Sequence, residues 1–332
     1  MDVSTLEWTI TLGVTIAVLL FDVIVIARDP HEPSMRECAV ALSFYVGAAV
    51  AFGAWVWIYH GQEFGIEFYT GWLVEYSLSV DNLFVFIVLM AALRVPREYQ
   101  QEALMVGIIL ALVFRGIFIA VGYQLIDNFS WVFYVFGAFL IYTAIGLVRS
   151  YRSHEDEHPE NSRVIKFART HLKTSEEFRG LKLWWKENGT RVLSPMLIVI
   201  IALGFTDIMF ALDSIPAIFG ITQEPYLVFT ANVFALMGLR QLYFLLGGLL
   251  KRLVYLSLGL AFILGWIGVK LIIHAMHEGH VVDFEIPTLM SLAVILVTLA
   301  VTAIASLRKT AKENDTGVAA TDSAPPAPKP SE

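Results

Sequence analysis

The chain has 332 residues, of which 57% are hydrophobic and only 16% are charged, and its mean hydropathy is +0.67. A soluble globular protein is nearer half apolar and a quarter charged, so this composition excludes that class. The net charge is -7, and the basic residues lie beside apolar stretches, so we expect no nucleic-acid partner. A single cysteine, Cys38, excludes an internal disulfide.

Nine apolar stretches are long enough to cross a bilayer, because about 20 apolar residues cover about 30 Å of hydrocarbon. The first lacks the basic start and small-residue cleavage site of a signal peptide, so we interpret it as an uncleaved span. We predict an all-α polytopic membrane helical bundle with about nine transmembrane helices, in a domain of residues 1–308. The spans lie near 8–26, 39–59, 68–93, 103–125, 130–148, 195–219, 228–250, 253–273 and 287–307.

The charges of the connections alternate along the chain. Lys or Arg follows the first, third, fifth, seventh and ninth spans, whereas the other connections carry only acidic charges. Cytoplasmic loops are rich in Lys and Arg, so the N-terminus is expected outside and the C-terminus in the cytoplasm. The polar segment 149–194 is then a cytoplasmic loop, expected to be helical over about 160–186. Residues 309–332, rich in Pro, Ala and Ser, are predicted to form a disordered cytoplasmic tail.

The third to fifth spans resemble the sixth to eighth. The third span reads EYSLSVDN and the sixth reads DIMFALDS, each with two acids six residues apart. An arginine follows in the next span of each set, and two glycines nine residues apart follow in the third. Because the third and sixth spans cross in opposite directions, stretches 68–148 and 195–273 are predicted to form a three-plus-three inverted repeat, as in many secondary transporters. The matched positions are Glu75, Asp81, Arg115, Gly137 and Gly146 against Asp207, Asp213, Arg240, Gly259 and Gly268.

Charged residues inside these spans need a compensating environment. An ionised side chain at a helix centre costs about 2.5–3.5 kcal/mol, so each must face the bundle interior, pair, or line a wet cavity. Six residues turn an ideal helix by about 600°, which leaves the two acids of one motif about 120° apart. Pro216 could kink or open the sixth span near Asp213 and so bring its two acids together.

Oxygen ligands dominate these motifs, and they suit Mn²⁺, Mg²⁺ or Ca²⁺. Four carboxylates outnumber the two central arginines, which favours a cation over an anion. The competing interpretation is that acids and bases pair only to lock the bundle. Buried pairs are weak evidence for stability, so the repeated pattern favours transport. The expected metal ligands are Glu75, Asp81, Asn82, Asp207 and Asp213, and the expected charge-pairing residues are Arg115, Arg240 and Lys270.

Other motifs in the sequence are weaker evidence of function. His274, His277 and His280 could receive a metal at the outer exit, but an ordinary interfacial helix end is the better interpretation. His154 and His158 are interpreted as part of a solvated loop. No intramembrane histidine accompanies the serines beside the acids, and no GxxxxGK[ST] motif is present. We therefore expect a secondary transporter rather than an enzyme, with no resident cofactor.

At EYSLSVDNLFVF (75–86) and FALDSIPAIFGIT (210–222) the chain resembles the TerC family of bacterial membrane proteins, and the likeness covers about residues 5–308. The resemblance implies a multi-pass protein of the bacterial cytoplasmic (inner) membrane with the acidic positions above as functional residues. Members are associated with tellurium resistance, several act as manganese exporters, and some are thought to supply manganese to secreted metalloenzymes.

The leading hypothesis is therefore export of a divalent metal cation, most simply manganese. The alternative is a tellurite-resistance protein that acts on an oxyanion or within a membrane complex. The expected partners are the metal ion and the lipid bilayer, with a second copy of the chain or a metalloenzyme that receives the metal as further candidates.

Overall fold

The computed structural model describes residues 1–28, 34–153, 178, 183–187, 190–246 and 254–322. Long helices make up almost all of this part of the chain, which confirms the predicted all-α polytopic bundle. The helices are α1 (Thr5–Arg28), α2 (Met35–His60), α3 (Gln62–Ala92), α4 (Arg97–Asn128), α5 (Val132–Ser153), α7 (Pro195–Phe219), α8 (Pro225–Leu236), α9 (Leu239–Leu246), α10 (Leu256–Glu278) and α11 (Thr288–Asp322).

Eight helical segments in the described residues are long and apolar enough to cross a membrane. They correspond to the second to ninth predicted spans. The apolar part of α1 that could be assessed runs only over Thr5–Val18, although the helix continues to Arg28. The count of nine spans therefore stays a prediction at α1.

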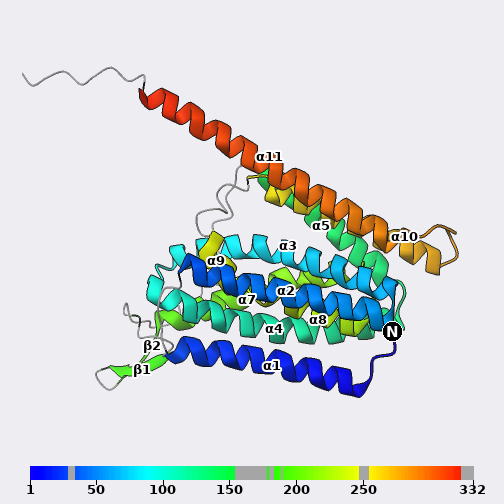
Figure 1. Ribbon diagram of the computed structural model, residues 1–332, viewed down its shortest axis with the longest axis horizontal. Coiled ribbons are helices and arrows are strands. Elements are labelled where there is room, and N and C mark those ends of the chain that lie inside the picture. Colours follow the sequence, from blue (N-terminus) through cyan, green and yellow to red (C-terminus); the bar gives the residue numbers. More distant parts are fainter. Residues whose placement is uncertain (29–33, 154–177, 179–182, 188–189, 247–253, 323–332) are drawn as a thin grey trace, which may run out of the picture.

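The helices lie roughly alongside one another, with α5, α10 and α11 grouped on one side of the bundle and α1 on the opposite side (Figure 1). The N-terminus and the α10–α11 connection lie at one end, and the end of α1 lies at the other with the β1–β2 hairpin (Figure 1). Helices α3, α4, α7 and α8 form the centre, where α3 packs on α7 and α8, and α4 packs on α7.

Local sequence signals set several helix starts. Ser34 and Glu37 form a capping box at the start of α2, since each side chain binds the other's backbone N–H, at 2.8 and 3.3 Å. Helix α7 begins at Pro195, whose missing N–H is not needed in a first turn, and the Ser194 hydroxyl accepts from the Met196 amide at 3.1 Å.

The seventh predicted span is broken rather than continuous. Helix α8 ends at Leu236, and α9 starts at Leu239 after Met237 and Gly238 leave helical geometry. Gly238 has a φ of +88°, which a side chain would strain. A Cβ there would also lie 3.1 Å from Leu42 Cδ1 of α2. The apolar run in the sequence hides this break, because hydropathy does not report backbone geometry.

Two expectations outside the spans are wrong in part. Residues 184–187 form a strand, β1 (Trp184–Glu187), paired antiparallel with β2 (Thr190–Leu193), rather than the end of a loop helix. The rest of the predicted loop helix lies almost entirely outside the described residues. Helix α11 continues to Asp322, so residues 309–322 are helical instead of disordered. Extending an existing helix is far easier than nucleating one, and this stretch begins with good helix formers.

Helices α5 and α10 cross at a pair of glycines. A Cβ at Gly137 would lie 2.7 Å from the Gly268 carbonyl oxygen, and one at Gly268 would lie 2.8 Å from the Gly137 oxygen. These two glycines occupy non-equivalent places in the predicted repeat, because Gly137 is the first of its pair and Gly268 is the second of the other. The close approach makes this helix pair the most extensive contact between two helices in the bundle.

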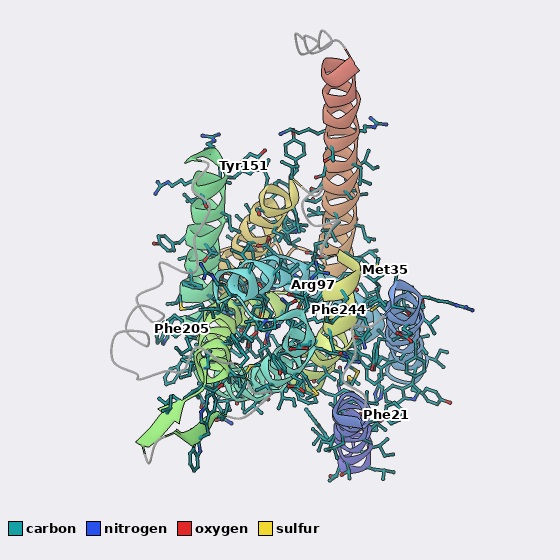
Figure 2. The ribbon with its side chains drawn as sticks, turned by 90° about the vertical axis from the view of Figure 1, so that its left-hand side faces the viewer. Phe21, Met35, Arg97, Tyr151, Phe205 and Phe244 are labelled. Atoms are coloured by element: carbon teal, nitrogen blue, oxygen red, sulfur yellow. The ribbon has the colours of Figure 1, made fainter. Side chains whose placement is uncertain are left out.

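The outer surface is apolar, as contact with lipid requires. Phe21 and Phe205 are 67% and 42% exposed, and their side chains lie on the outside of the bundle (Figure 2). Inside, the buried apolar residues form two clusters, one at each end of the bundle. The larger contains Phe68, Phe133 and Tyr226, and the smaller contains Met90 and its neighbours at the other end. The two clusters leave a layer between them for the charged residues.

Candidate functional site

A polar layer lies midway along three central helices, between the two apolar clusters. On α4, Ala111 belongs to one cluster and Ile119 to the other, and Arg115 stands between them. On α7, Asp207 likewise separates Leu203 from Ala211. These are the charged positions that the sequence predicts inside the membrane.

Arg115 joins the first acids of both motifs. Its Nη1 donates to Glu75 Oε2 at 2.6 Å, and its Nη2 lies 3.7 Å from Asp207 Oδ1. All three side chains are at least 96% buried. Two carboxylates therefore share one guanidinium, so the described contacts give this cluster one more negative than positive group when all three are ionised. Such a buried cluster is attractive to a cation.

Asn82 is a further contact of Arg115, whose buried Nε has no hydrogen-bond partner among the described residues. With its amide oriented so that both atoms find partners, Oδ1 accepts from Arg115 Nη2 at 3.3 Å and Nδ2 donates to the Leu78 carbonyl oxygen at 3.1 Å. The structure thus brings together three of the five expected ligands, Glu75, Asn82 and Asp207, around one of the three expected charge-pairing residues.

Several buried oxygens in this layer lack a hydrogen-bond partner among the residues described. They are Glu75 Oε1, Asp207 Oδ2 and the hydroxyls of Ser79 and Ser214, although Ser214 lies close enough to Glu75 for a weak hydrogen bond between their side chains. All four residues are at most 3% exposed. Native proteins rarely leave buried polar atoms unpaired unless a water or an ion occupies the site. The layer therefore offers oxygen acceptors in a place where the protein itself does not use them.

In the described part of the chain, Asp81 and Asp213, the second acids of the two motifs, contact other helices and not Arg115. Asp213 on α7 accepts from Thr143 Oγ1 of α5 at 3.1 Å, and Asp81 on α3 accepts from Ser257 Oγ of α10 at 3.4 Å. Each acid is therefore tied to the third helix of the opposite repeat. Neither Thr143 nor Ser257 was singled out by the sequence, which gives no sign that a hydroxyl on a glycine-rich span faces an acid.

The five expected ligands do not form a single metal centre in this conformation. Among the described residues, no three His, Cys, Asp or Glu side chains are grouped as metal ligands. The suggestion that Pro216 opens its helix near Asp213 is wrong, because α7 runs unbroken from Pro195 to Phe219. The two acids of each straight helix consequently point to different neighbours, as their angular separation of about 120° requires.

The four acids nevertheless lie at staggered depths. Gly71 of α3 faces Ile218 of α7, and Phe86 of α3 faces Phe210, so these two helices are antiparallel. Glu75 of α3 lies beside Ser214 of α7, in the same antiparallel register as the Gly71–Ile218 contact. In that register Asp213 lies near the level of Glu75, and Asp207 lies near the level of Asp81. Six residues rise about 9 Å, so the four acids occupy two levels about 9 Å apart, each with one acid from each motif.

The other expected charge-pairing residues lie away from this cluster. Arg240 is on α9, just after the break, and α9 packs mainly on α2. Lys270 is on α10 and donates to Thr288 Oγ1 of α11 at 3.4 Å. Arg115 is the expected charge-pairing residue that contacts the motif acids Glu75 and Asp207.

The outer histidines have local partners. His274 Nδ1 lies 2.8 Å from Glu285 Oε1 and its Nε2 lies 2.8 Å from Gln223 Nε2, while His277 Nδ1 lies 3.1 Å from the Val282 carbonyl oxygen. These contacts fit the ordinary helix-end interpretation over a metal-receiving cluster. His154 and His158 lie outside the described residues.

Comparison with known proteins agrees with this architecture. A family model of TerC integral membrane proteins matches residues 60–314, which include all of the motif acids. The chain belongs to the TerC family of integral membrane proteins. No solved structure is similar to it.

Bacterial relatives cover most of the chain. A Mycobacterium tuberculosis membrane protein is 44% identical over 317 residues, 92% of this chain and 80% of the relative. A Myxococcus xanthus membrane protein is 39% identical over 303 residues, 91% of this chain and 92% of the relative. Escherichia coli Alx, named as a candidate membrane-bound redox modulator, is 36% identical over 285 residues, 83% of this chain and 85% of the relative.

Proposed function

We propose that this protein is a secondary transporter that exports a divalent metal cation, manganese, across the bacterial cytoplasmic membrane. The observation that carries the proposal is the buried Glu75–Arg115–Asp207 cluster with its unpartnered oxygens. A structural ion pair would be expected to satisfy its oxygens internally, whereas an ion-conducting layer must keep some of them available.

The staggered acids support a route through the membrane rather than one binding site. In our proposal a cation passes from the level of Asp81 and Asp207 to the level of Glu75 and Asp213. About 9 Å along the helix axis separates these two levels. Metal binding at the centre would weaken the hold of Arg115 on the carboxylates, and that guanidinium would neutralise them again once the site is empty.

A broken span is a second feature that the chain shares with secondary transporters, which commonly contain interrupted helices. Here the break lies against Leu42 and Tyr45 of α2, away from the Glu75–Arg115–Asp207 cluster, so it supports the class of protein and not the position of the site. The break at Met237 and Gly238 lies within the second span of the second repeat, two residues before Arg240. The equivalent span of the first repeat, α4, is continuous and carries Arg115.

The choice of cation follows from ligand chemistry and from the family. Carboxylates, amide oxygens and hydroxyls favour Mn²⁺, Mg²⁺ or Ca²⁺ over soft metals. Among these ions, export of manganese is what the likeness to the TerC family implies. The charges of the connections favour an external N-terminus and a cytoplasmic C-terminus, which places Asp81 toward the cytoplasm.

The name of the Alx relative suggests redox chemistry. The present chain has one cysteine, Cys38, and it is buried on α2, so it offers no dithiol pair within one chain. We therefore propose that any redox effect would be indirect, through the cellular supply of a metal.

The decisive experiment measures cellular manganese under manganese load in a bacterial strain that lacks its own exporters. The wild-type protein is expected to lower cellular manganese and improve survival, and Asp81→Asn and Asp213→Asn are expected to abolish both effects at normal expression. Asp127→Asn, at an exposed position in the last turn of α4, is the matched control and should behave as wild type.

Unchanged manganese with a well-inserted protein would overturn the proposal. Tellurite resistance that depends on Arg115 and Arg240 but not on the acids would move the oxyanion alternative to first place.

A further inference from the structure

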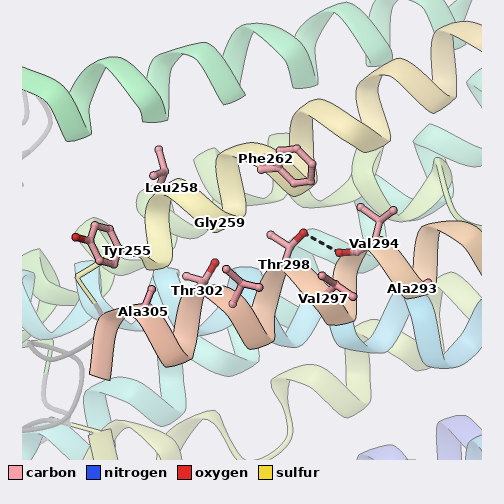
Figure 3. Close-up of a pocket in the computed structure, with 11 residues that line it drawn as sticks. Tyr255, Leu258, Gly259, Phe262, Ala293, Val294, Val297, Thr298, Thr302 and Ala305 are labelled. Atoms are coloured by element: carbon pink, nitrogen blue, oxygen red, sulfur yellow. Dashed lines mark hydrogen bonds between the residues drawn. The ribbon is translucent and has the colours of Figure 1, made fainter. Parts of the chain in front are cut away.

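An apolar groove lies between α10, the third helix of the second predicted repeat, and α11, which follows the repeats. It has a volume of about 790 Å³ and is lined from α10 by residues such as Leu258 and Phe262 and from α11 by residues such as Val297 and Ala305 (Figure 3). The polar atoms among its lining residues are the hydroxyls of Tyr255, Thr298 and Thr302 and the backbone, and no lining residue is charged. Thr298 uses its hydroxyl within its own helix, donating to the Val294 carbonyl oxygen at 2.7 Å.

The two helices are fixed at both ends of the groove. At one end the Tyr255 amide donates to the Ser306 hydroxyl at 3.0 Å, and at the other the Trp266 indole N–H donates to the Ser291 hydroxyl at 3.4 Å. Gly259 lets α10 approach Thr302 closely, since a Cβ there would lie 2.4 Å from the Thr302 hydroxyl oxygen. These contacts hold the helices together without filling the space between them.

The length of the groove matches one leaflet. Its lining on α11 runs from Ala293 to Ala305, which is about 18 Å along the helix. Half of a hydrocarbon layer of about 30 Å is about 15 Å. An acyl chain that enters from the end at Tyr255 would therefore lie along the groove over the depth of its own leaflet.

Positive charge gathers at the Tyr255 end. The Lys309 ammonium lies 5.3 Å from the centre of the Tyr255 ring, and Arg308 beside it is exposed. The first turn of α10 begins there without a side-chain cap, so its N–H groups add partial positive charge. Tyr151 of α5 packs near Tyr255, with ring centres 6.3 Å apart, as in the aromatic belt of a membrane interface.

We infer that the α10–α11 groove binds one anionic phospholipid, with an acyl chain in the groove and the phosphate on Arg308 and Lys309. A second copy of this chain is a poorer occupant, because a two-fold contact through this groove would bring the same two basic residues of both copies together. With the C-terminus in the cytoplasm, the lipid belongs to the cytoplasmic leaflet, where anionic headgroups attract basic residues. The inference does not depend on metal export.

The test uses the full chain reconstituted in vesicles of equal phosphatidylglycerol and phosphatidylcholine, then extracted in mild detergent for native mass spectrometry. We expect one retained phosphatidylglycerol, preferred over phosphatidylcholine by about tenfold or more. Ala305→Trp and Val301→Trp fill the groove at two places and should each remove the retained lipid. Ile304→Trp, on the same helix but outside the groove, should retain it.

The charge is tested separately. Arg308→Gln combined with Lys309→Gln should remove the preference for phosphatidylglycerol, whereas Arg36→Gln, an exposed arginine at the start of α2, should leave it. Equal retention of both lipids by the wild type, or equal retention by the groove-filling variants and Ile304→Trp, would overturn the inference. A lipid-free dimer that Ala305→Trp dissociates would assign the groove to a contact between copies instead.

Discussion

The two halves of the predicted repeat share the order of their motifs but differ in how they use their second span. In the first repeat, α4 is an unbroken helix of 32 residues whose arginine neutralises acids of both halves. In the second, the equivalent span is split into α8 and α9, and its arginine lies beyond the split. One half therefore supplies a rigid countercharge and the other a local interruption of the helix. The comparison suggests that a duplicated fold can assign different tasks to matched positions.

Removing the rigid countercharge should have the largest effect. Arg115→Met leaves Glu75 and Asp207 buried without their partner, and breaking a buried ion pair costs about 3–5 kcal/mol. We expect a large drop in the thermal stability of the detergent-solubilised protein, measured by the loss of its monodisperse chromatographic peak on heating. Arg115→Met combined with Glu75→Gln and Asp207→Asn should recover much of that stability but not transport. If Arg115→Met is as stable as the wild type, the ion-pair cluster does not contribute to the stability of the fold.

The crossing of α5 and α10 at Gly137 and Gly268 should be equally sensitive to substitution on either helix. Gly137→Val and Gly268→Val each place a side chain against the opposite carbonyl oxygen, and overpacking of this kind costs about 1–3 kcal/mol. The same heating assay should show similar losses for both variants. Gly146→Val is the control, because a Cβ there meets no atom within 4 Å. A loss at Gly146 as large as at Gly137 would contradict close packing as the cause.

A single added methyl group should be enough to perturb the helix break at Gly238. Gly238→Ala forces a side chain into a left-handed backbone conformation, which costs about 1–2 kcal/mol. We expect lower thermal stability and slower manganese export, because the interrupted span of the second repeat is strained. Gly47→Ala, in a helix with nothing within 4 Å of the added methyl group, should be neutral or slightly stabilising. Unchanged export and stability in Gly238→Ala would remove the break from the mechanism.

Variants of the two acids of α7 should distinguish an effect on stability from an effect on export. Asp213→Asn keeps a side chain that can accept from Thr143, so its effect on stability should stay below about 0.5–1 kcal/mol while export is lost. Asp207→Asn weakens the partner of Arg115 and should lower both stability and export. Thr143→Val tests whether the hydroxyl is needed to hold Asp213 in place. Similar stability losses for both acid variants would remove the distinction drawn here.

Much of the bundle follows from the sequence because its signals are strong. Long apolar runs, the two spaced acidic motifs and the paired glycines predict the helices, the burial of Glu75 and Asp207, and their angular separation from Asp81 and Asp213. The break at Gly238 could not be predicted, since one glycine in an apolar run is common and does not by itself end a helix. Nor could the choice of partners, because the sequence does not say whether Arg115 faces one acid or two, or that Thr143 and Ser257 bind the others.

The exchange of partners between halves has an evolutionary consequence. Arg115 belongs to the first half but faces Asp207 in the second, Thr143 of the first half binds Asp213, and Ser257 of the second binds Asp81. If the two halves descend from one ancestral half that paired with its own copy, they have since diverged beyond such self-pairing. Without the first half, Asp207 and Asp213 would lose the contacts to Arg115 and Thr143. We therefore expect the second half to be unstable in a membrane when it is made alone.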